Sequence, residues 1–569
     1  MAESVLDLID VKFQDATSHT SVTSEDVIGM VMPYYWGESD KILTLYKSSF
    51  FEMFPETMPL GCNGVTMGGN NSDLDIYTGY AQIKSAFNHG AGAVEIYRPS
   101  KGWKWQRVTV TTAGVTSGQV SKENTQYIAD DENKSFVVGL KYAGFVPKSL
   151  AYGYDGISIG IQIKSSDEYI DGKVVVINVY GRNGSGNSAE YSSPIETFEG
   201  ATNPSANIGG ENIFLENIIN NKSQFISVRV FNELENNASG SSTEQKRDFD
   251  SYTKPTLDDN FLDGVKEGYT FFRDFELSNA TLVINPFVKN GNFTKTEGEG
   301  GDAVTTTFDF MSEIDSLTSS LVAYRKNCMA VVGYPIDVVY NKTSIETYFN
   351  SGVASNALGN KFCIALQGRE YVSVFGQRFT LNCVGGYCGA MVNTAKEVRI
   401  NQIASGYTYG MYGGSLKESL KSGEVIDLME EGIDSIYTSK RGNLIWGTRT
   451  MYSRQTSYFG KANVMRVCSM ILRNIFPIAV ETLHTDAASN PITRASLSTM
   501  LNSIIDTYIA NQDLHADSYA DCSDALNTDY LTKGGTVLNI VLMLHFIGLV
   551  ERVSIKIIAT DTSVTAEFV

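Results

Sequence analysis

The 569-residue sequence is poor in the residues that disulfide frameworks, metal sites and membrane spans require. Its seven cysteines are an odd number without a C-x-x-C pair, and the closest two, Cys383 and Cys388, have no second pair or nearby histidine to complete a zinc site. We therefore expect reduced, mostly buried thiols. The most apolar run, 537–550, is too short to cross a bilayer and contains Asn539 and His545, so no membrane insertion is expected. A secretory signal is also lacking.

Sequence motifs of enzymes are equally scarce. Residues 156–160 match G-x-S-x-G, but Ser158 lies in a strictly alternating strand pattern and not at the strand-turn-helix elbow that a nucleophile requires. The five histidines fall outside any metal-binding frame, and His545 is expected to be a packed core residue in an apolar strand. The sequence predicts no enzyme, no catalytic residue, no cofactor and no metal.

Basic residues are too few overall for a nucleic-acid-binding protein, because the net charge is −19. The exception is the basic segment, residues 440–480, which holds seven Lys and Arg residues and no Asp or Glu. Two interpretations remain open at this point. The segment is either a solvated basic face or a docking surface for an acidic neighbour.

The second half of the basic segment has the pattern of an amphipathic helix. Apolar residues recur at i, i+3, i+4 and i+7 between 464 and 475, and they leave Arg466 and Arg473 on the opposite face. The pattern therefore predicts a helix that buries one stripe and presents arginines on the other.

The first half of the basic segment, residues 442–450, reads G-N-L-I-W-G-T-R-T. It resembles the G-x-x-x-W-G-x-R-T signature of contractile tail sheath proteins of bacteriophages and related injection machines, and Trp446, Gly447, Arg449 and Thr450 are the signature residues. Upstream, residues 432–436 resemble the G-I-N-x-I phrase of the same family. The resemblance covers most of the chain and is weakest between residues 234 and 319.

Pattern and resemblance together predict a multidomain protein of α+β or α/β class. An α/β core carries a β-rich protruding domain and extended, strand-like arms at both ends. The expected divisions are an N-terminal linking arm (1–26), part of the sheath middle domain (27–98), an outward β-rich domain (99–235), the rest of the middle domain with a subtilisin-like layer (236–395), a core domain facing an inner tube (396–552) and a C-terminal linking arm (553–569). Polar residues 234–260 and glycine-rich residues 290–303 are expected to be surface loops.

An isolated apolar strand cannot satisfy its backbone or bury its side chains, so the N-terminal arm must pair with the body of its own chain or with another chain. The resemblance to sheath proteins, which extend this arm into a neighbouring subunit, implies that the arms link subunits. The residues assigned to this linkage are Val5, Leu6, Leu8, Ile9, Val11, Val553, Ile555, Ile557 and Ile558. The residues assigned to contact with the inner tube or a neighbouring subunit are Arg449, Arg454, Lys461, Arg466 and Arg473.

The resemblance implies a structural role. Copies of the chain would stack as hexameric rings in a helical lattice around an inner tail tube, with baseplate and tail terminator proteins as further partners, and would contract to drive the tube through a host envelope for genome delivery. Such a protein is assembled in the bacterial cytoplasm and resides in the virion. A sheath from a non-viral injection system is an alternative, and a carbohydrate-binding tail spike is a weaker one, because neither a long repeat nor a paired-carboxylate site is present.

Overall fold

The computed structural model describes residues 17–18, 26–56, 77–111, 114–121, 134–144, 146–147, 149–164, 174–184, 188–234, 243–249, 259–289, 292–297, 304–351, 360–452, 457–527, 537–549, 555–559 and 564–568. Helices and several separate sheets make up these residues, so the expected mixed class is confirmed.

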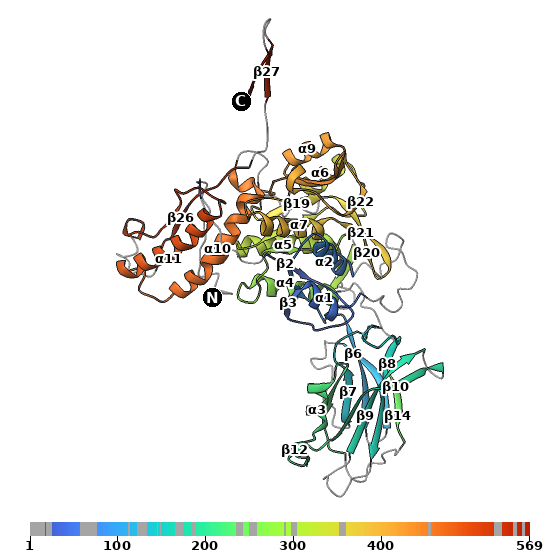
Figure 1. Ribbon diagram of the computed structural model, residues 1–569. Coiled ribbons are helices and arrows are strands. Elements are labelled where there is room, and N and C mark those ends of the chain that lie inside the picture. The colour runs from blue at the N-terminus through green and yellow to red at the C-terminus, as the bar shows by residue number, and fades with distance from the viewer. Residues whose placement is uncertain are drawn as a thin grey trace.

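A mostly parallel eight-stranded sheet forms the centre of the molecule (Figure 1), in the order β24-β23-β19-β18-β15-β2-β4-β3. Its strands are β2 (Val27–Val31), β3 (Ile42–Tyr46), β4 (Ala93–Tyr97), β15 (Leu282–Ile284), β18 (Met329–Gly333), β19 (Cys363–Gln367), β23 (Ile433–Ser439) and β24 (Gly442–Trp446). The inner strands β2, β4, β15, β18 and β19 are buried at every residue, because parallel strands covered on both faces have no solvated side.

Helices cover both faces of this sheet. Gly29 of β2 lies against Phe272 of α4 (Asp259–Arg273), whereas Met30, the next residue, contacts Gly79 of α2 (Thr78–Asn88). Because successive strand residues point to opposite faces, α4 and α2 lie on opposite sides of the sheet. The helix α5 (Phe310–Arg325) packs beside α4, and α7 (Val384–Glu397) packs beside α2.

The central sheet is built from two separate parts of the chain. Residues 27–97 supply three strands and residues 282–446 supply five. The expected boundary at residue 396 does not coincide with the edge of the sheet, because β23 and β24 complete it. The expected surface loop at 234–260 was wrong for residues 245–248, which form a strand, and for residues 259–260, which begin α4.

A β-sandwich is inserted between these two parts and extends from one end of the body (Figure 1). One sheet has the order β13-β7-β5-β6 and the other β10-β9-β8-β14. Their strands are β5 (Lys104–Thr111), β6 (Gly114–Ser121), β7 (Lys134–Leu140), β8 (Gly156–Lys164), β9 (Val174–Asn183), β10 (Glu190–Ala201), β13 (Ile226–Val230) and β14 (Gln245–Asp248). The alternating isoleucines of β8 are buried in the core. The β-rich unit thus extends past residue 235, because β14 pairs with β8.

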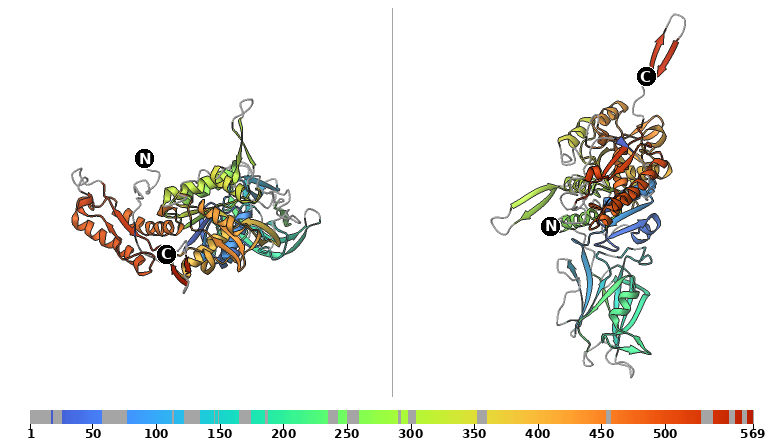
Figure 2. Two further views of the ribbon diagram at one scale, coloured as in Figure 1. Left: turned by 90° about the horizontal axis from the view of Figure 1, so that it is seen from above. Right: turned by 90° about the vertical axis from the view of Figure 1, so that its left-hand side faces the viewer.

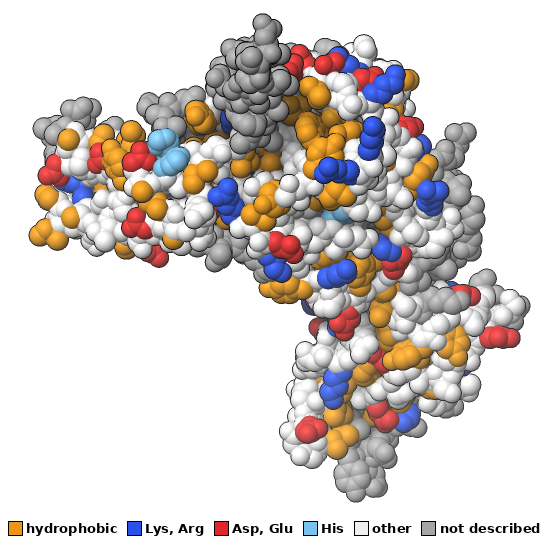
Figure 3. Space-filling model, turned by 45° about the horizontal axis from the view of Figure 1, so that its top comes forward, with side chains coloured by type: hydrophobic (Ala, Val, Ile, Leu, Met, Phe, Trp, Pro, Cys, Tyr) orange, Lys and Arg blue, Asp and Glu red, His pale blue; other side chains and the backbone are white. Residues whose placement is uncertain are grey.

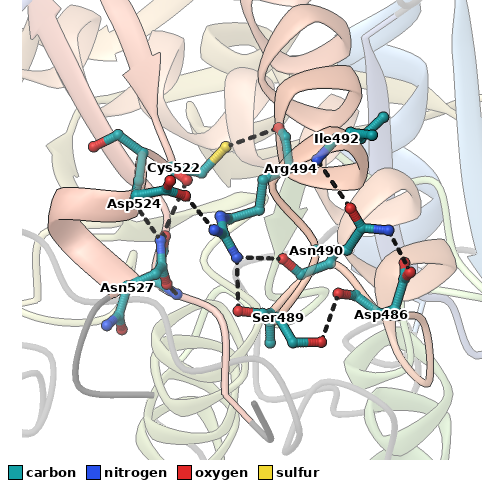
Figure 4. Close-up of polar contacts among 12 residues, drawn as sticks. Asp486, Ser489, Asn490, Ile492, Arg494, Cys522, Asp524 and Asn527 are labelled. Atoms are coloured by element: carbon teal, nitrogen blue, oxygen red, sulfur yellow. Dashed lines mark hydrogen bonds and ion pairs between the residues drawn. The ribbon is translucent and has the colours of Figure 1, made fainter. Parts of the chain in front are cut away.

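The C-terminal part contains two long helices, α10 (Ala462–Thr482) and α11 (Pro491–Ala510), which pack together. Beside them is a three-stranded sheet of β1 (Thr17–Ser18), β26 (Val541–His545) and β25 (Tyr519–Asp521). Asn490 caps α11 by accepting from the Ile492 N–H at 3.0 Å. Buried Arg494 donates to the Ala488 carbonyl at 2.7 Å and pairs with Asp524, which ties α11 to the segment after β25 (Figure 4).

Two hairpins project from the body (Figure 2). One is β16 (Asn292–Glu297) with β17 (Val304–Asp309), and the other is β27 (Ile555–Ala559) with β28 (Val564–Phe568). The prediction of a loop at 290–303 was therefore wrong for residues 292–297, because this run pairs antiparallel with the threonine-rich run 304–309.

Shorter elements complete the described residues. They are α1 (Lys47–Met53), α3 (Leu215–Lys222), α6 (Lys342–Ser351), α8 (Gly406–Tyr409), α9 (Ser422–Glu430), β11 (Asn207–Ile208), β12 (Glu211–Asn212), β20 (Arg369–Val374), β21 (Gln377–Asn382) and β22 (Ser415–Glu418).

Candidate assembly site

The signature segment, residues 442–450, lies where the central sheet meets α10, and it is built around one buried carboxylate. Asp434 of β23 is fully buried. Its Oδ1 accepts the Arg449 N–H at 3.1 Å, and its Oδ2 accepts the Tyr387 hydroxyl at 2.8 Å. A Cβ at Gly447 would lie 2.0 Å from Asp434 Oδ1, so only glycine lets the chain pass this close to the carboxylate.

The end of the signature fixes the start of α10. The buried Thr450 donates its hydroxyl to the Phe459 carbonyl at 2.7 Å and its N–H to the Gly460 carbonyl at 3.0 Å. The Ala462 N–H, at the first residue of the helix, bonds to the Thr448 carbonyl at 2.8 Å. The W-G-x-R-T sequence is therefore a structural joint in which one segment holds both a strand edge and a helix start.

Asp434 is held in an unusual ionisation state. Burial raises its pKa to about 7, and the Arg449 N–H, the Tyr387 hydroxyl and the Arg449 charge offset only part of that effect.

Trp446 lies beside two tyrosines and is half-buried. Its ring meets those of Tyr407 and Tyr437 edge-on, with centroids at 6.2 and 6.5 Å. Tyr407 is 48% exposed and carries the Arg441 guanidinium 4.8 Å above its ring. The half-buried Trp446 and the exposed Tyr407 thus form an aromatic group at the surface of the molecule.

The assignment of Arg466 to an exposed helix face is wrong. Arg466 is only 2% exposed. Its Nη2 forms an ion pair with Asp26 at 2.6 Å, and its Nη1 donates to the Met391 carbonyl at 2.9 Å. The physical reason is that α10 is covered on both sides: the apolar stripe predicts one buried face correctly, but the opposite face is covered by polar groups of the same chain.

The other basic residues divide into three groups. Arg473 is half-buried and donates to the backbone carbonyl and side chain of Asn279, and burial lowers its pKa. Arg449 and Lys461, also half-buried, form a bridge between their backbones at the signature joint. Arg454 lies outside the described residues. Contact of these side chains with a tube or a neighbour stays a prediction.

Lysine and arginine side chains do not form one patch on the face of the molecule in Figure 3, where they are interspersed with acidic ones. Of the described basic residues of this segment, Arg466 is buried, Arg449, Lys461 and Arg473 are half-buried, and Lys440 and Arg441 are exposed.

The residues assigned to linkage fall at the margins of the described chain. Those at 5–11 and Val553 lie outside it. Ile555, Ile557 and Ile558 belong to β27, which pairs antiparallel with β28 and stands away from the body (Figure 1). Their role in linkage stays a prediction.

Reactive side chains elsewhere have structural surroundings. Ser158 is buried in mid-strand and donates to Asp248 at 2.8 Å. The prediction of a core position for His545 was wrong: its side chain is 43% exposed and lies 2.9 Å from Asp517, because β26 exposes one face. Within the described residues, no three His, Cys, Asp or Glu side chains are grouped to hold a metal ion.

The helix α10 is long and apolar enough to cross a membrane by length and composition, but 67% of the apolar window is buried inside the fold. Its composition is that of a core helix between α7 and α11.

Comparisons with known proteins found similarity to solved structures at low sequence identity. No protein-family model and no curated protein matches the sequence. A sheath tail protein from Listeria innocua is 12% identical with a TM-score of 0.48, over 89% of this chain and 90% of that chain. A sheath tail protein from Desulfitobacterium hafniense is 12% identical with a TM-score of 0.43, over 90% and 93%. The contracted helical sheath of the anti-feeding prophage is 9% identical with a TM-score of 0.47, over 98% and 99%.

Two of these structures are named as sheath tail proteins and the third as a helical sheath.

Proposed function

We propose that this chain is the sheath subunit of a contractile tail or injection machine. Copies polymerise as stacked hexameric rings around an inner tube, and the lattice shortens to drive the tube through a cell envelope. The chain acts as a structural element without a catalytic site.

The observation that carries this proposal is the signature segment at 442–450. Its glycine, arginine and threonine are each used by the joint between the central sheet and α10, and its tryptophan reaches the surface. A chance match to G-x-x-x-W-G-x-R-T would have no reason to engage Gly447, Arg449 and Thr450 in one structural joint.

The terminal arms support the proposal through their need for a partner. In the hairpin β27–β28, the paired residues Ile555 with Phe568, Ile557 with Ala566 and Ala559 with Val564 alternate onto one face, and all six are apolar. A two-stranded hairpin is at best marginally stable alone. Burial against a neighbouring subunit would stabilise it, and strand addition is the ordinary mode for such a segment.

An open helical array is the kind of assembly that a subunit with unlike surfaces and two linking arms would form. Each subunit would offer unlike surfaces to its neighbours, which produces an open helical array rather than a closed oligomer. Arms that pair by backbone hydrogen bonds keep neighbours linked while the rigid bodies rotate into a shorter lattice with more buried surface. The inner tube, baseplate and terminator are the partners this role requires.

Phage tails and non-viral injection systems would use the same subunit design, and the proposal covers both. Residence in a virion and genome delivery apply to the first, and residence in a non-viral injection machine applies to the second. Assembly in the bacterial cytoplasm agrees with six described cysteines that are all buried and unpaired.

Negative-stain electron microscopy of the purified full-length chain tests the proposal. Striated hollow tubes with six-fold symmetry in end view are expected, since the contracted lattice needs no tube as a template. Discrete monomers or trimers, both from the chain alone and after co-expression with the genes that flank it, would contradict the proposal.

A further inference from the structure

The two arms leave the body at neighbouring points along one helix. Asp26 is the first described residue after the N-terminal arm and directly precedes β2, and Ile547 lies just before the C-terminal arm. Both points are tied to α10, through Arg466 and Asn463 respectively. These two side chains are three residues apart and therefore share one face of the helix.

The root of the N-terminal arm is fixed by an ion pair. Arg466 Nη2 lies 2.6 Å from Asp26 Oδ2, and the two side chains are 3% and 6% exposed. The next residue, Val27, is fixed as well, because its N–H donates to Thr281 Oγ1 at 3.0 Å. The chain thus leaves the body from a buried, fixed point.

The root of the C-terminal arm is fixed by two amides. Asn463 Nδ2 donates to Asn401 Oδ1 at 2.7 Å, and Asn401 Nδ2 donates to the Ile547 carbonyl at 2.9 Å. The Asn401 backbone N–H donates to Asp513 Oδ1 at 2.8 Å. Asn401 and Asp513 are fully buried, so these bonds have no competing water.

Asp513 joins the two roots electrostatically. Burial raises its pKa to about 6, and the Asn401 N–H and the charges of Arg399 and Arg466 act against that rise. Asp513 Oδ2 and Arg466 Nε are both buried without a hydrogen-bond partner. Arg466 therefore pairs with Asp26 by direct contact, and its charge acts against the raised pKa of Asp513.

The N-terminal arm also contacts the C-terminal part of the body at the backbone level. Thr17 and Ser18 of β1 pair in parallel with Leu544 and His545 of β26. These two residues of the N-terminal arm thus lie beside the strand that precedes Ile547.

We infer that Asp26, Asn401, Asn463, Arg466 and Asp513, the arm-root network, are positioning residues that couple the two linking arms within one subunit. This inference rests on the proposed function for the meaning of the arms. A buried polar network is stable when complete, and loss of one member leaves a buried charge or amide without its partner. A pull that displaces one root would therefore loosen the other, and a subunit would transmit strain from one neighbour to the next.

Amide hydrogen exchange of the full-length chain tests the coupling at both roots. Asp26→Asn keeps the shape and an acceptor oxygen but removes the charge. We expect exchange to become at least fivefold faster in peptides covering 26–32 and also in peptides covering 541–549. Glu481→Gln is the control on the same helix, because Glu481 is exposed near the far end of α10, and it should change neither peptide. Faster exchange confined to 26–32 would overturn the inference.

A second variant tests the coupling from the opposite end and does not touch the ion pair. Asn463→Ser shortens the side chain that holds Asn401, and it should accelerate exchange at 26–32 as well as at 541–549. An effect at 541–549 alone would again overturn the inference, and this variant serves if Asp26→Asn yields no soluble protein. All proteins are compared in the same assembly state, checked by microscopy. A chain that forms no tubes yet shows coupled exchange would contradict the proposed function and not this inference.

Discussion

The helix α10 and the hairpin β27–β28 were both expected to contact other chains, but α10 is largely buried inside the fold, whereas the hairpin stands away from the body. The helix places Arg466 against Asp26 and Arg473 against Asn279, both within its own chain. The hairpin stands off from the body and has six apolar residues at paired positions on one face. Charge in the sequence therefore did not identify a free surface at Arg466, whereas the linking role of the hairpin stays a prediction that rests on its apolar residues.

The largest expected effect is on assembly and comes from the hairpin. Ile557→Lys places a charge in the middle of the apolar face, and the yield of tubes should fall at least tenfold because a desolvated charge opposes pairing with a neighbour. Thr294→Lys in the hairpin β16–β17 is the matched control, because Thr294 pairs with Thr307 on a polar face. Sedimentation followed by electron microscopy measures the yield. Normal tubes from Ile557→Lys, or equal loss from Thr294→Lys, would contradict the assignment.

The N-terminal arm should behave like the hairpin. Deletion of residues 1–12 should leave a folded subunit that fails to polymerise, because the apolar strand has no other evident use than pairing. Circular dichroism checks the fold and microscopy checks the assembly. Tubes of normal length from the truncated chain would refute a linking role for these residues.

Substitutions in the helix α10 should instead lower the stability of the folded chain. Arg466→Glu leaves Asp26 facing a second buried carboxylate, and the loss of such a pair costs about 3–5 kcal/mol. Arg473→Glu should cost about 1 kcal/mol, since this side chain is only half-buried. Denaturant unfolding of the two variants side by side measures the difference. Equal losses would mean that α10 does not bury Arg466 in solution.

The smallest expected effect concerns pH and the signature joint. The folded chain keeps the proton of Asp434 up to about pH 7, whereas the unfolded chain loses it near the ordinary value of 3.8. The stability that Asp434 contributes is complete below that lower value and is lost as the pH rises to about 7. Asp434→Asn cannot ionise and still accepts the Arg449 N–H. Relative to wild type, the free energy of unfolding of this variant should therefore increase by roughly 1–3 kcal/mol as the pH rises from 4.5 to 8.

Thermal unfolding at several pH values measures that gain. Glu370 also has a pKa raised by burial to about 7, but it is present in both proteins and cancels in the comparison. A constant difference between wild type and Asp434→Asn across this range would contradict a protonated Asp434.

Much of the central sheet could be predicted from the sequence, because its strands are short apolar runs ended by glycine or proline. The stretches 27–31 and 329–333 show this directly, since they are buried on both faces. The isoleucine alternation of β8 likewise identified a sandwich strand. The resemblance to sheath proteins is carried by residues 442–450 of the sequence itself.

The sequence could not show which polar residues meet in space. Arg466 lies 440 positions from Asp26, and no local pattern connects them. Asp434 is one of several polar residues in β23, which reads I-D-S-I-Y-T-S, so no local pattern distinguishes it as the buried carboxylate. Helical periodicity predicted which face of α10 is apolar, but it holds no information on whether the polar face meets water or another part of the chain.

A cryo-electron microscopy reconstruction of the assembled tubes tests the central claim most directly. The account predicts that residues 555–568 of one subunit lie on a neighbouring subunit with their apolar face covered, while Arg466 stays buried against Asp26 of its own chain. A map in which the hairpin folds back onto its own body, or in which Arg466 faces the tube lumen, would contradict it.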